Sequence, residues 1–366
     1  MNITLVISSL GAGGAERVLT GMANWWSLKG HQVTIITFSD VPPFYRLDQN
    51  VHCIQLDLLS NSRNFYQAIK NVFLRIYKVR TAIKQSNPDV VISFLDRTNI
   101  VALIACFGLG YKVFVSERTN PLFLPIGKMW SILRKMTYSH AAGLIVQTQS
   151  IVPWGRTLID SDKIFVIPNA IDDERATQIQ EASVIAVEVP WQYRIITMGR
   201  LSQEKGHDLL LRACARLFTK YSNWGLEIIG DGGLKEKLML LAQELGISHR
   251  VKFYGQVQKP FGHIKGADIF VLPSRVEGFP NALLEAMAMG KAVVSFDCPS
   301  GPSDLIQHCD SGLLVTPESI DSMAIAIEEL MISPEKRQQL GCSAQRVQST
   351  FSEKHIMDLW DKVIQT

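Results

Sequence analysis

The 366-residue sequence contains no apolar run long enough to cross a lipid bilayer. The longest run, Ile100 to Tyr111, would span about 18 Å as a helix, whereas the hydrocarbon core of a bilayer is roughly 30 Å thick. A strand is expected from Ile3 to Ser8, almost directly after Met1, so we expect no signal peptide. These absences predict a cytoplasmic protein that can associate with the inner face of the cytoplasmic membrane only as a peripheral protein.

Cysteine is scarce, and metal-binding motifs are missing. The six cysteines lie far apart and form no C-x-x-C pair, which argues against a zinc site and, in a chain of this length, against a disulfide framework. The only D-x-D motif, Asp160 to Asp162, precedes an expected strand instead of following one. We therefore expect no bound metal, no resident cofactor and a reducing compartment.

The glycine fingerprint of nicotinamide-binding proteins is incomplete. Gly11, Gly13 and Gly14 follow the first expected strand and precede a helix, but Glu16 stands where the last glycine of G-x-G-x-x-G belongs. The backbone amides of such a turn can still receive a phosphate, because the start of a helix favours an anion. A simple tight turn is the alternative interpretation.

The sequence does contain the alternation of strands and helices that is typical of parallel α/β sheets. It is 47% hydrophobic and 19% charged, as expected of a globular protein. Strands are expected at 3–8, 32–38, 90–94, 112–116 and 142–147, and again at 194–198, 225–229, 251–254, 268–272 and 292–296. We expect Rossmann-like domains at 1–170 and 191–347, a linker at 171–190, and a last helix within 348–366 that returns to the first domain.

Positive charge is concentrated in the first domain. Residues 1–170 hold 17 Lys and Arg against 9 Asp and Glu. Much of the excess lies in the amphipathic stretch Arg63 to Lys84, with cations that include Lys70, Arg75 and Lys78. This stretch and a second one, Leu122 to Tyr138, suit an anionic membrane, unless their apolar stripes face the core and the cations are merely solvated. No recognition motif accompanies the charge, so we expect no nucleic-acid partner.

The most informative segment runs from Pro273 to Gly290. It places Glu277 and Glu285 around a helix start, directly after the apolar strand Ile269 to Leu272. Open parallel sheets bind ligands at the carboxyl ends of their strands, and a carboxylate only accepts hydrogen bonds, so such a pair suits a ligand rich in hydroxyls. A strand, a Glu, seven residues and a second Glu, with Gly-Phe-Pro between them, resembles the donor-site signature of the retaining GT-B glycosyltransferases of family four.

This resemblance covers nearly the whole chain. It implies the GT-B fold, an α/β architecture of two Rossmann-like parallel-sheet domains that face a deep interdomain cleft. It also implies that Glu277 contacts the hydroxyls of the donor sugar and that Glu285 holds the ribose. Further donor contacts are implied at Gly13, Gly14, Val257, Gly278, Phe279 and Asn281.

A basic turn follows the strand that ends at Met198. Its two cations, Arg200 and Lys205, can converge on one diphosphate, the first through a planar fork and the second as a point charge. In the resembling family these positions hold the leaving diphosphate. The implied reaction is substitution at the anomeric carbon with retention, in which Arg200 and Lys205 stabilise the departing group and Glu277 positions the sugar.

Acceptor contacts are expected at strand ends of the first domain. The candidates are polar residues directly after two apolar strands, together with the cations of the first amphipathic stretch: Asp96, Glu117, Arg118, Lys70, Arg75 and Lys78. Close relatives often carry a His where this chain has Arg118. Polar residues that merely cap the strands are the alternative interpretation.

The segment from Ser93 to Ile100 and the loop from Asp297 to Ile306 resemble bacterial transferases that extend undecaprenyl-diphosphate-linked glycans with N-acetylgalactosamine or a hexose. The resemblance implies a UDP-hexose or UDP-N-acetylhexosamine donor, with N-acetylgalactosamine as the best guess, and a polyprenyl-diphosphate-linked acceptor. A GDP-mannose-dependent mannosyltransferase and a non-hydrolysing UDP-sugar epimerase of similar architecture are the alternatives. An epimerase should carry several carboxylates and a His at the reacting sugar, and the sequence offers no such set.

Overall fold

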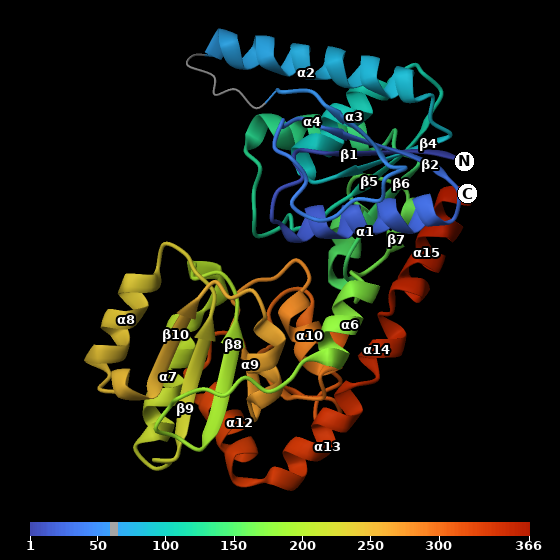
Figure 1. Ribbon diagram of the computed structural model, residues 1–366. Coiled ribbons are helices and arrows are strands. Elements are labelled where there is room, and N and C mark those ends of the chain that lie inside the picture. The colour runs from blue at the N-terminus through green and yellow to red at the C-terminus, as the bar shows by residue number, and fades with distance from the viewer. Residues whose placement is uncertain (59–64) are drawn as a thin grey trace. The chain divides into compact units, whose positions relative to one another are not determined.

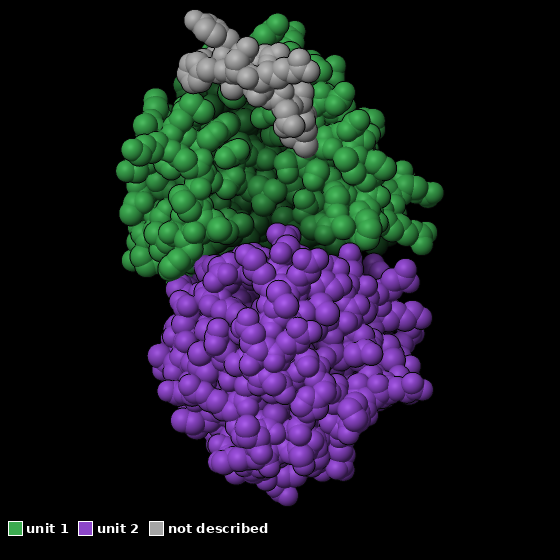
Figure 2. Space-filling view, turned by 90° about the vertical axis from the view of Figure 1, so that its left-hand side faces the viewer, with its two compact units in different colours: residues 1–170, 356–366 green, residues 171–355 purple. Residues whose placement is uncertain are grey.

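The computed structural model describes residues 1–58 and 65–366 (Figure 1). The chain forms two compact units, coloured separately in Figure 2. Unit 1 comprises Met1–Ala170 and Ile356–Thr366, and unit 2 comprises Ile171–His355. Each unit is built on one parallel sheet, which confirms the expected α/β architecture. Arg63, at the start of the first amphipathic stretch, lies outside the described residues.

Unit 1 has a sheet of seven described strands in the order β3-β2-β1-β4-β5-β6-β7. The strands are β1 (Asn2–Ile7), β2 (Gln32–Thr37), β3 (His52–Gln55), β4 (Val90–Phe94), β5 (Lys112–Ser116), β6 (Gly143–Val146) and β7 (Ile164–Val166). The helices are α1 (Gly14–Leu28), α2 (Phe65–Ser86), α3 (Asp96–Cys106), α4 (Lys128–Tyr138), the short α5 (Val152–Gly155) and most of α15 (Glu353–Gln365). Helix α2 packs on α3, and α3 packs on α4, while α1 lies on the opposite side of the sheet (Figure 1).

Unit 2 has a sheet in the order β10-β9-β8-β11-β12-β13. The strands are β8 (Tyr193–Met198), β9 (Trp224–Ile229), β10 (Val251–Gly255), β11 (Ile269–Leu272), β12 (Ala292–Phe296) and β13 (Leu313–Val315). The helices are α6 (Asp173–Glu181), α7 (His207–Phe218), α8 (Lys235–Glu244), α9 (Pro260–Gly266), α10 (Asn281–Ala288), α11 (Pro302–Leu305), α12 (Ile320–Ile332), α13 (Pro334–Ala344) and α14 (Val347–Thr350).

Each sheet reverses its winding direction once. In unit 1 the chain runs outward from β1 to β3 and then returns to place β4 on the other side of β1. In unit 2 it runs outward from β8 to β10 and returns to place β11 beside β8, where Ile269 pairs with Ile195. Ligands of open α/β sheets bind outside the carboxyl ends of the strands at such a switch point. The candidate sites are therefore the loops after β1 and β4 and the loops after β8 and β11.

Two stretches near the boundary between the units differ from the expectation. Segment 171–190, expected as a linker, contains α6 and belongs to unit 2. The backbone N–H of Arg175 donates to Asp172 Oδ1 at 2.8 Å, so a capping side chain starts a helix in a segment whose apolar pattern is weak. Residues 348–355 also belong to unit 2, and only the last eleven residues, Ile356–Thr366, join unit 1.

Trp360 of helix α15 packs against aromatic side chains of unit 1. The Trp360 ring is 1% exposed and stacks on Phe94 with ring centroids 6.2 Å apart. It also meets Trp26 edge-on at 6.5 Å, and the Trp26 indole N–H donates to Asp361 Oδ1 at 2.7 Å. These contacts join the C-terminal helix to α1 and to the end of β4.

We expect Trp360→Ala to destabilise unit 1 by about 3–5 kcal/mol, because the truncation leaves a large cavity beside Phe94 and Trp26. Denaturant unfolding followed by fluorescence and circular dichroism measures this change. Lys362→Ala, at an exposed position of the same helix, serves as the control and should change stability by less than about 0.5 kcal/mol. Equal stabilities of the two variants would contradict this account.

Candidate functional site

The loops after β8 and β11 bring two of the predicted donor residues into direct contact. Lys205 Nζ lies 2.6 Å from Glu277 Oε1 and 2.8 Å from Oε2. The Ser274 hydroxyl also donates to Glu277 Oε1 at 2.6 Å, and the Ser300 hydroxyl donates to the Glu277 carbonyl. The Glu277 residue is 7% exposed, so its orientation is fixed by these partners. The ammonium group has three N–H donors, and one remains available for a ligand.

Close backbone approach holds the two loops together. Gly206, which ends the turn after β8, has φ +64°, and a Cβ at this position would lie 1.9 Å from the Pro273 carbonyl oxygen of the loop after β11. A side chain here would therefore push the two loops apart as well as strain the backbone. The Arg275 backbone N–H closes the contact by donating to the Glu204 carbonyl at 2.8 Å.

The other predicted donor residues surround this pair. Arg200 is exposed in the same turn, where its backbone carbonyl accepts from the Ser202 N–H at 3.0 Å. Glu285 is buried on α10, and its Oε1 lies 3.8 Å from Arg175 Nε. Gly278, Phe279 and Asn281 form the loop and the first residue of α10, and Val257 follows β10. Their contacts with a donor stay predictions.

The glycine turn of unit 1 contains its own carboxylate. Helix α1 begins at Gly14 after Gly13, and a Cβ on Gly13 would lie 2.0 Å from Glu16 Oε2. The Glu16 carboxylate thus occupies the space in front of the turn, where an anion would otherwise lie. A phosphate can approach Gly13 and Gly14 only after this flexible side chain has moved, so their predicted role stays a prediction.

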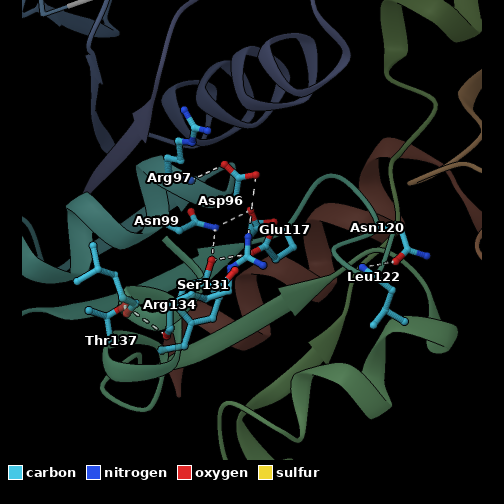
Figure 3. A network of polar contacts seen from close by, with 12 residues as sticks. Asp96, Arg97, Asn99, Glu117, Asn120, Leu122, Ser131, Arg134 and Thr137 are labelled. Carbon is cyan, nitrogen blue, oxygen red and sulfur yellow. Dashed lines mark hydrogen bonds and ion pairs between the residues drawn. The ribbon is translucent and has the colours of Figure 1, made fainter. Parts of the chain in front are cut away.

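Acceptor candidates Asp96 and Glu117 belong to a polar network within unit 1 (Figure 3). The Tyr138 hydroxyl donates to Glu117 Oε1 at 2.5 Å, and Arg134 Nη2 lies 3.5 Å from the same oxygen. Arg134 Nη2 also lies 4.0 Å from Asp96 Oδ2. Burial raises the pKa of Glu117, although Arg134 and the Tyr138 hydroxyl oppose the shift. A direct acceptor contact would require the enclosed Glu117 carboxylate to leave Tyr138, whereas Asp96 is partly exposed.

The sequence did not reveal that Arg134 is a buried residue. Arg134 is one of the cations of the second amphipathic stretch, yet it is 6% exposed and reaches from α4 to the end of β5. Tyr138, one turn further along α4, is fully buried beside it. The positions of both residues on the inner face of α4 depend on the packing of α4 against α3, which the periodicity of Leu122 to Tyr138 does not specify.

Arg118 is enclosed at the end of β5. Its guanidinium lies 3.9 Å from the centroid of the Phe94 ring, and its Nη1 donates to Asn169 Oδ1 at 2.9 Å. Burial lowers the pKa of Arg118 to about 9. Among the described residues no hydrogen-bond partner contacts its Nε or Nη2. In this structure Arg118 therefore packs against the unit that carries it, and its acceptor role stays a prediction.

The predicted cations of the first amphipathic stretch lie on α2. Arg75 Nε donates to the Leu58 carbonyl at 3.1 Å and Lys78 Nζ to the Leu56 carbonyl at 3.3 Å, while Lys70 is exposed. Val79 and Ile83 are buried, as the expected apolar stripe requires. The same helix also exposes large apolar side chains that the stripe does not explain, namely Phe73, Leu74 and Tyr77.

A second exposed apolar surface lies on α4 and the loop before it. Its members are more than 45% exposed, and we call them the α4 surface: Leu122, Phe123, Leu124, Met129, Ile132 and Met136. Lys128 and Lys135 lie among them. Monomeric soluble proteins seldom expose a contiguous apolar patch of this kind without a partner. The α4 surface lies on the side of the helix opposite the buried Arg134.

A cavity of about 570 Å³ lies elsewhere in unit 2, and none of the predicted site residues lines it. Glu353 is among its lining residues, and burial raises the pKa of this carboxyl to about 7. Across residues 1–58 and 65–366, no group of three or more His, Cys, Asp or Glu is placed to hold a metal ion. In the same part of the chain, no helix is both long and apolar enough to span a bilayer.

Comparisons with protein families match both halves of the chain. The model described as glycosyl transferases group 1 matches residues 181–347, and the model described as glycosyltransferase family 4 matches residues 12–175. The first match contains the loops after β8 and β11, and the second contains Gly13, Gly14 and the network around Glu117.

Two curated relatives come from Campylobacter jejuni. One is an α-1,4-N-acetyl-D-galactosaminyltransferase whose name specifies an undecaprenol-diphosphate-linked acceptor; it is 30% identical over 367 residues, covering 100% of this chain and 98% of the relative. The other, a 4-α-N-acetylgalactosaminyltransferase named for a diphospho-undecaprenol acceptor, is 30% identical and covers 89% of each chain. Among solved structures, HepE of Anabaena in complex with UDP and glucose has a TM-score of 0.77 at 18% identity, covering 100% of this chain and 98% of that one.

The buried network predicts a stability difference between the two acidic acceptor candidates. Glu117→Ala should lower the free energy of unfolding by about 3–5 kcal/mol, because it leaves the Arg134 guanidinium buried without its close partner. Asp96→Asn should cost less than about 1 kcal/mol, because the Asp96 carboxylate is more distant from Arg134 and partly exposed. Chemical denaturation measures both values. A loss below about 1 kcal/mol for Glu117→Ala would show that the network does not support α4.

Proposed function

Because this chain belongs to the glycosyltransferases, with a group 1 half and a family 4 half, we propose that it transfers a hexose or N-acetylhexosamine, with N-acetylgalactosamine as the best guess, from a UDP-sugar to a lipid-diphosphate-linked glycan. The observation that carries the proposal is the contact between Lys205 and Glu277 at the switch point of unit 2. One group of this pair suits a diphosphate and the other suits sugar hydroxyls. The setting we propose is the assembly of bacterial surface polysaccharides or protein-linked glycans.

The charge arrangement suits the departure of a diphosphate. A carboxylate beside a diphosphate would normally repel it, but the Lys205 ammonium contacts both Glu277 oxygens and has one donor left for a phosphate oxygen. Arg200 in the same turn adds a second cation. As the bond between the anomeric carbon and the phosphate breaks, negative charge grows on the diphosphate, and these two cations stabilise it. We propose that transfer proceeds with retention and that the cations make a metal ion unnecessary.

The names of the two relatives support the proposed acceptor. Both act on glycans linked to undecaprenol through a diphosphate, and both transfer N-acetylgalactosamine. We propose the same acceptor class for this chain, with α2, α4 and the partly exposed Asp96 on the acceptor side. Lys70 on α2 remains exposed for an anionic headgroup, and the α4 surface supplies apolar side chains that can enter the boundary between headgroups and acyl chains.

Nucleotide binding tests the donor assignment directly. Calorimetric titration of the purified protein with UDP, GDP and NAD in a chelating buffer should show binding of UDP and of neither competitor. Assays with UDP-sugars and a short-chain polyprenyl-diphosphate glycan then identify the transferred sugar. Preferential binding of GDP would favour mannosyl transfer instead. NAD binding without UDP or GDP binding would refute a donor site built on the two carboxylates.

Lys205→Ala should lower turnover by about 100- to 1000-fold while the fold stays intact, because the variant loses a donor to the departing diphosphate and leaves Glu277 without its cation. Steady-state kinetics and circular dichroism measure the two properties. Lys220→Ala is the matched control, since Lys220 is an exposed lysine of unit 2 that pairs with Glu328. Turnover of Lys205→Ala close to that of the control would rule out the assigned role.

The α4 surface should bind anionic membranes. Replacing Ile132 and Met136 by Ser should weaken sedimentation with vesicles of phosphatidylglycerol and phosphatidylethanolamine by about tenfold, because two exposed apolar side chains can no longer insert. Raising the salt concentration should also weaken vesicle binding by the wild-type protein, because salt screens its cations from the anionic lipids. Met239→Ser and Leu240→Ser, at exposed positions on α8 of unit 2, form the control. Equal vesicle binding by the two double variants would place the membrane contact elsewhere.

A further inference from the structure

One guanidinium group joins the segments that carry the two donor residues. Arg275 lies in the loop after β11, two positions before Glu277, and its Nη1 donates to the carbonyl of Gln203 at 2.8 Å. Gln203 begins the turn after β8 that leads to Lys205. The Arg275 side chain thus crosses from the loop that carries Glu277 to the turn that carries Lys205.

The carboxylate of Asp208, in the first turn of α7, completes the connection. Arg275 Nη1 donates to Asp208 Oδ1 at 2.9 Å, and Nη2 donates to Oδ2 at 2.8 Å. Two parallel hydrogen bonds fix both the distance and the relative orientation of the groups, which a single contact does not. Burial would raise the pKa of Asp208, but the hydrogen bonds and the charge of Arg275 lower it below its ordinary value. The pair is therefore charged at neutral pH.

Arg275 itself is not placed to touch a donor. Its Nε donates to Glu318 Oε2 at 2.9 Å, so each of its three side-chain nitrogens already has a partner in unit 2. Any effect of Arg275 on the reaction must pass through Lys205 and Glu277. Small displacements of such groups matter, since about 1 Å of misplacement costs on the order of 100-fold in rate.

We propose that Arg275 and Asp208 form a positioning pair that sets the separation of Lys205 and Glu277, so that the diphosphate and the sugar of one donor are recognised together. The proposal rests on the proposed function, because it assigns a diphosphate to Lys205 and a sugar to Glu277. Neither Arg275 nor Asp208 is assigned a contact with the donor itself. In the sequence, Arg275 and Asp208 carry no signal of this role, since they are 67 positions apart.

The test compares Asp208→Asn and Arg275→Lys with the wild-type protein. Asp208→Asn keeps the shape of the side chain but removes its charge and one of its two acceptor oxygens, and Arg275→Lys keeps the charge but removes the fork. We expect kcat with the UDP-sugar to fall by about 10- to 100-fold, while the dissociation constant of UDP alone changes by less than about threefold. The double variant should be no slower than the slower single variant, because both residues act as one unit.

Arg216 and Asp321 provide the matched control. They form an ion pair in the same unit, also starting from α7, but both side chains are more than half exposed. Arg216→Lys and Asp321→Asn should leave kcat and the affinity for UDP unchanged. If the two Arg275 and Asp208 variants match these controls in kcat, or if their effects simply add in the double variant, the positioning role is overturned.

Hydrogen exchange separates a failure of this proposal from a failure of the proposed function. In the protein without substrate, the amides of residues 203–206 should exchange at least several-fold faster in Asp208→Asn and Arg275→Lys than in the wild type. This result does not depend on which sugar is transferred. Unchanged exchange would refute the positioning pair even in an active enzyme. Faster exchange in a protein that transfers no sugar would refute the proposed function and keep the pair.

Discussion

The adjacency of β8 and β11 is the constraint on which the proposed donor site depends. The chain winds outward from β8 and returns to the other side of the same strand, so the loops at the carboxyl ends of β8 and β11 are neighbours. Without that reversal, β8 and β11 would not be neighbours, and the turn that carries Lys205 would lie apart from the loop that carries Glu277. Gly206 then allows a backbone approach that no residue with a Cβ permits, and the contact between the two side chains follows.

Both units compensate buried charge, and they do so with different consequences. In unit 1, Glu117 is fully enclosed and relies on Arg134 and on the Tyr138 hydroxyl, which makes it a support for α4. In unit 2, Lys205 is partly exposed, and its contact with Glu277 leaves one donor for a ligand. An enclosed pair cannot lose one partner without leaving a buried charge uncompensated, whereas a charge that is paired and still accessible can exchange partners with a substrate. This difference distinguishes a structural network from a candidate site.

Helix α4 connects a surface to the end of the sheet. Its outer side exposes Ile132 and Met136, and its inner side holds Arg134 against Glu117 and Asp96. A lipid-linked acceptor would need both an apolar contact for its chain and polar contacts for its head, and the exposed apolar side chains of α4 suit the first of these. Through the buried Arg134, the proposed membrane face on α4 is thus joined to Asp96 and Glu117, two of the proposed acceptor residues.

The sequence alone determined the fold class, eleven of the thirteen described strands, including the one after Asp162, and the segments of the proposed donor loops. Interior parallel strands are continuous apolar runs, and the turns after them carry glycine and charge. The sequence did not predict β3 and β13, which are short and lie at sheet edges, where one-sided burial leaves little pattern. Only the tertiary structure decided that Arg134 is buried against Glu117 and that Arg275 meets Asp208. These contacts join residues that are far apart in the sequence. Local spacing carries no information about which distant side chain will pack against a given residue.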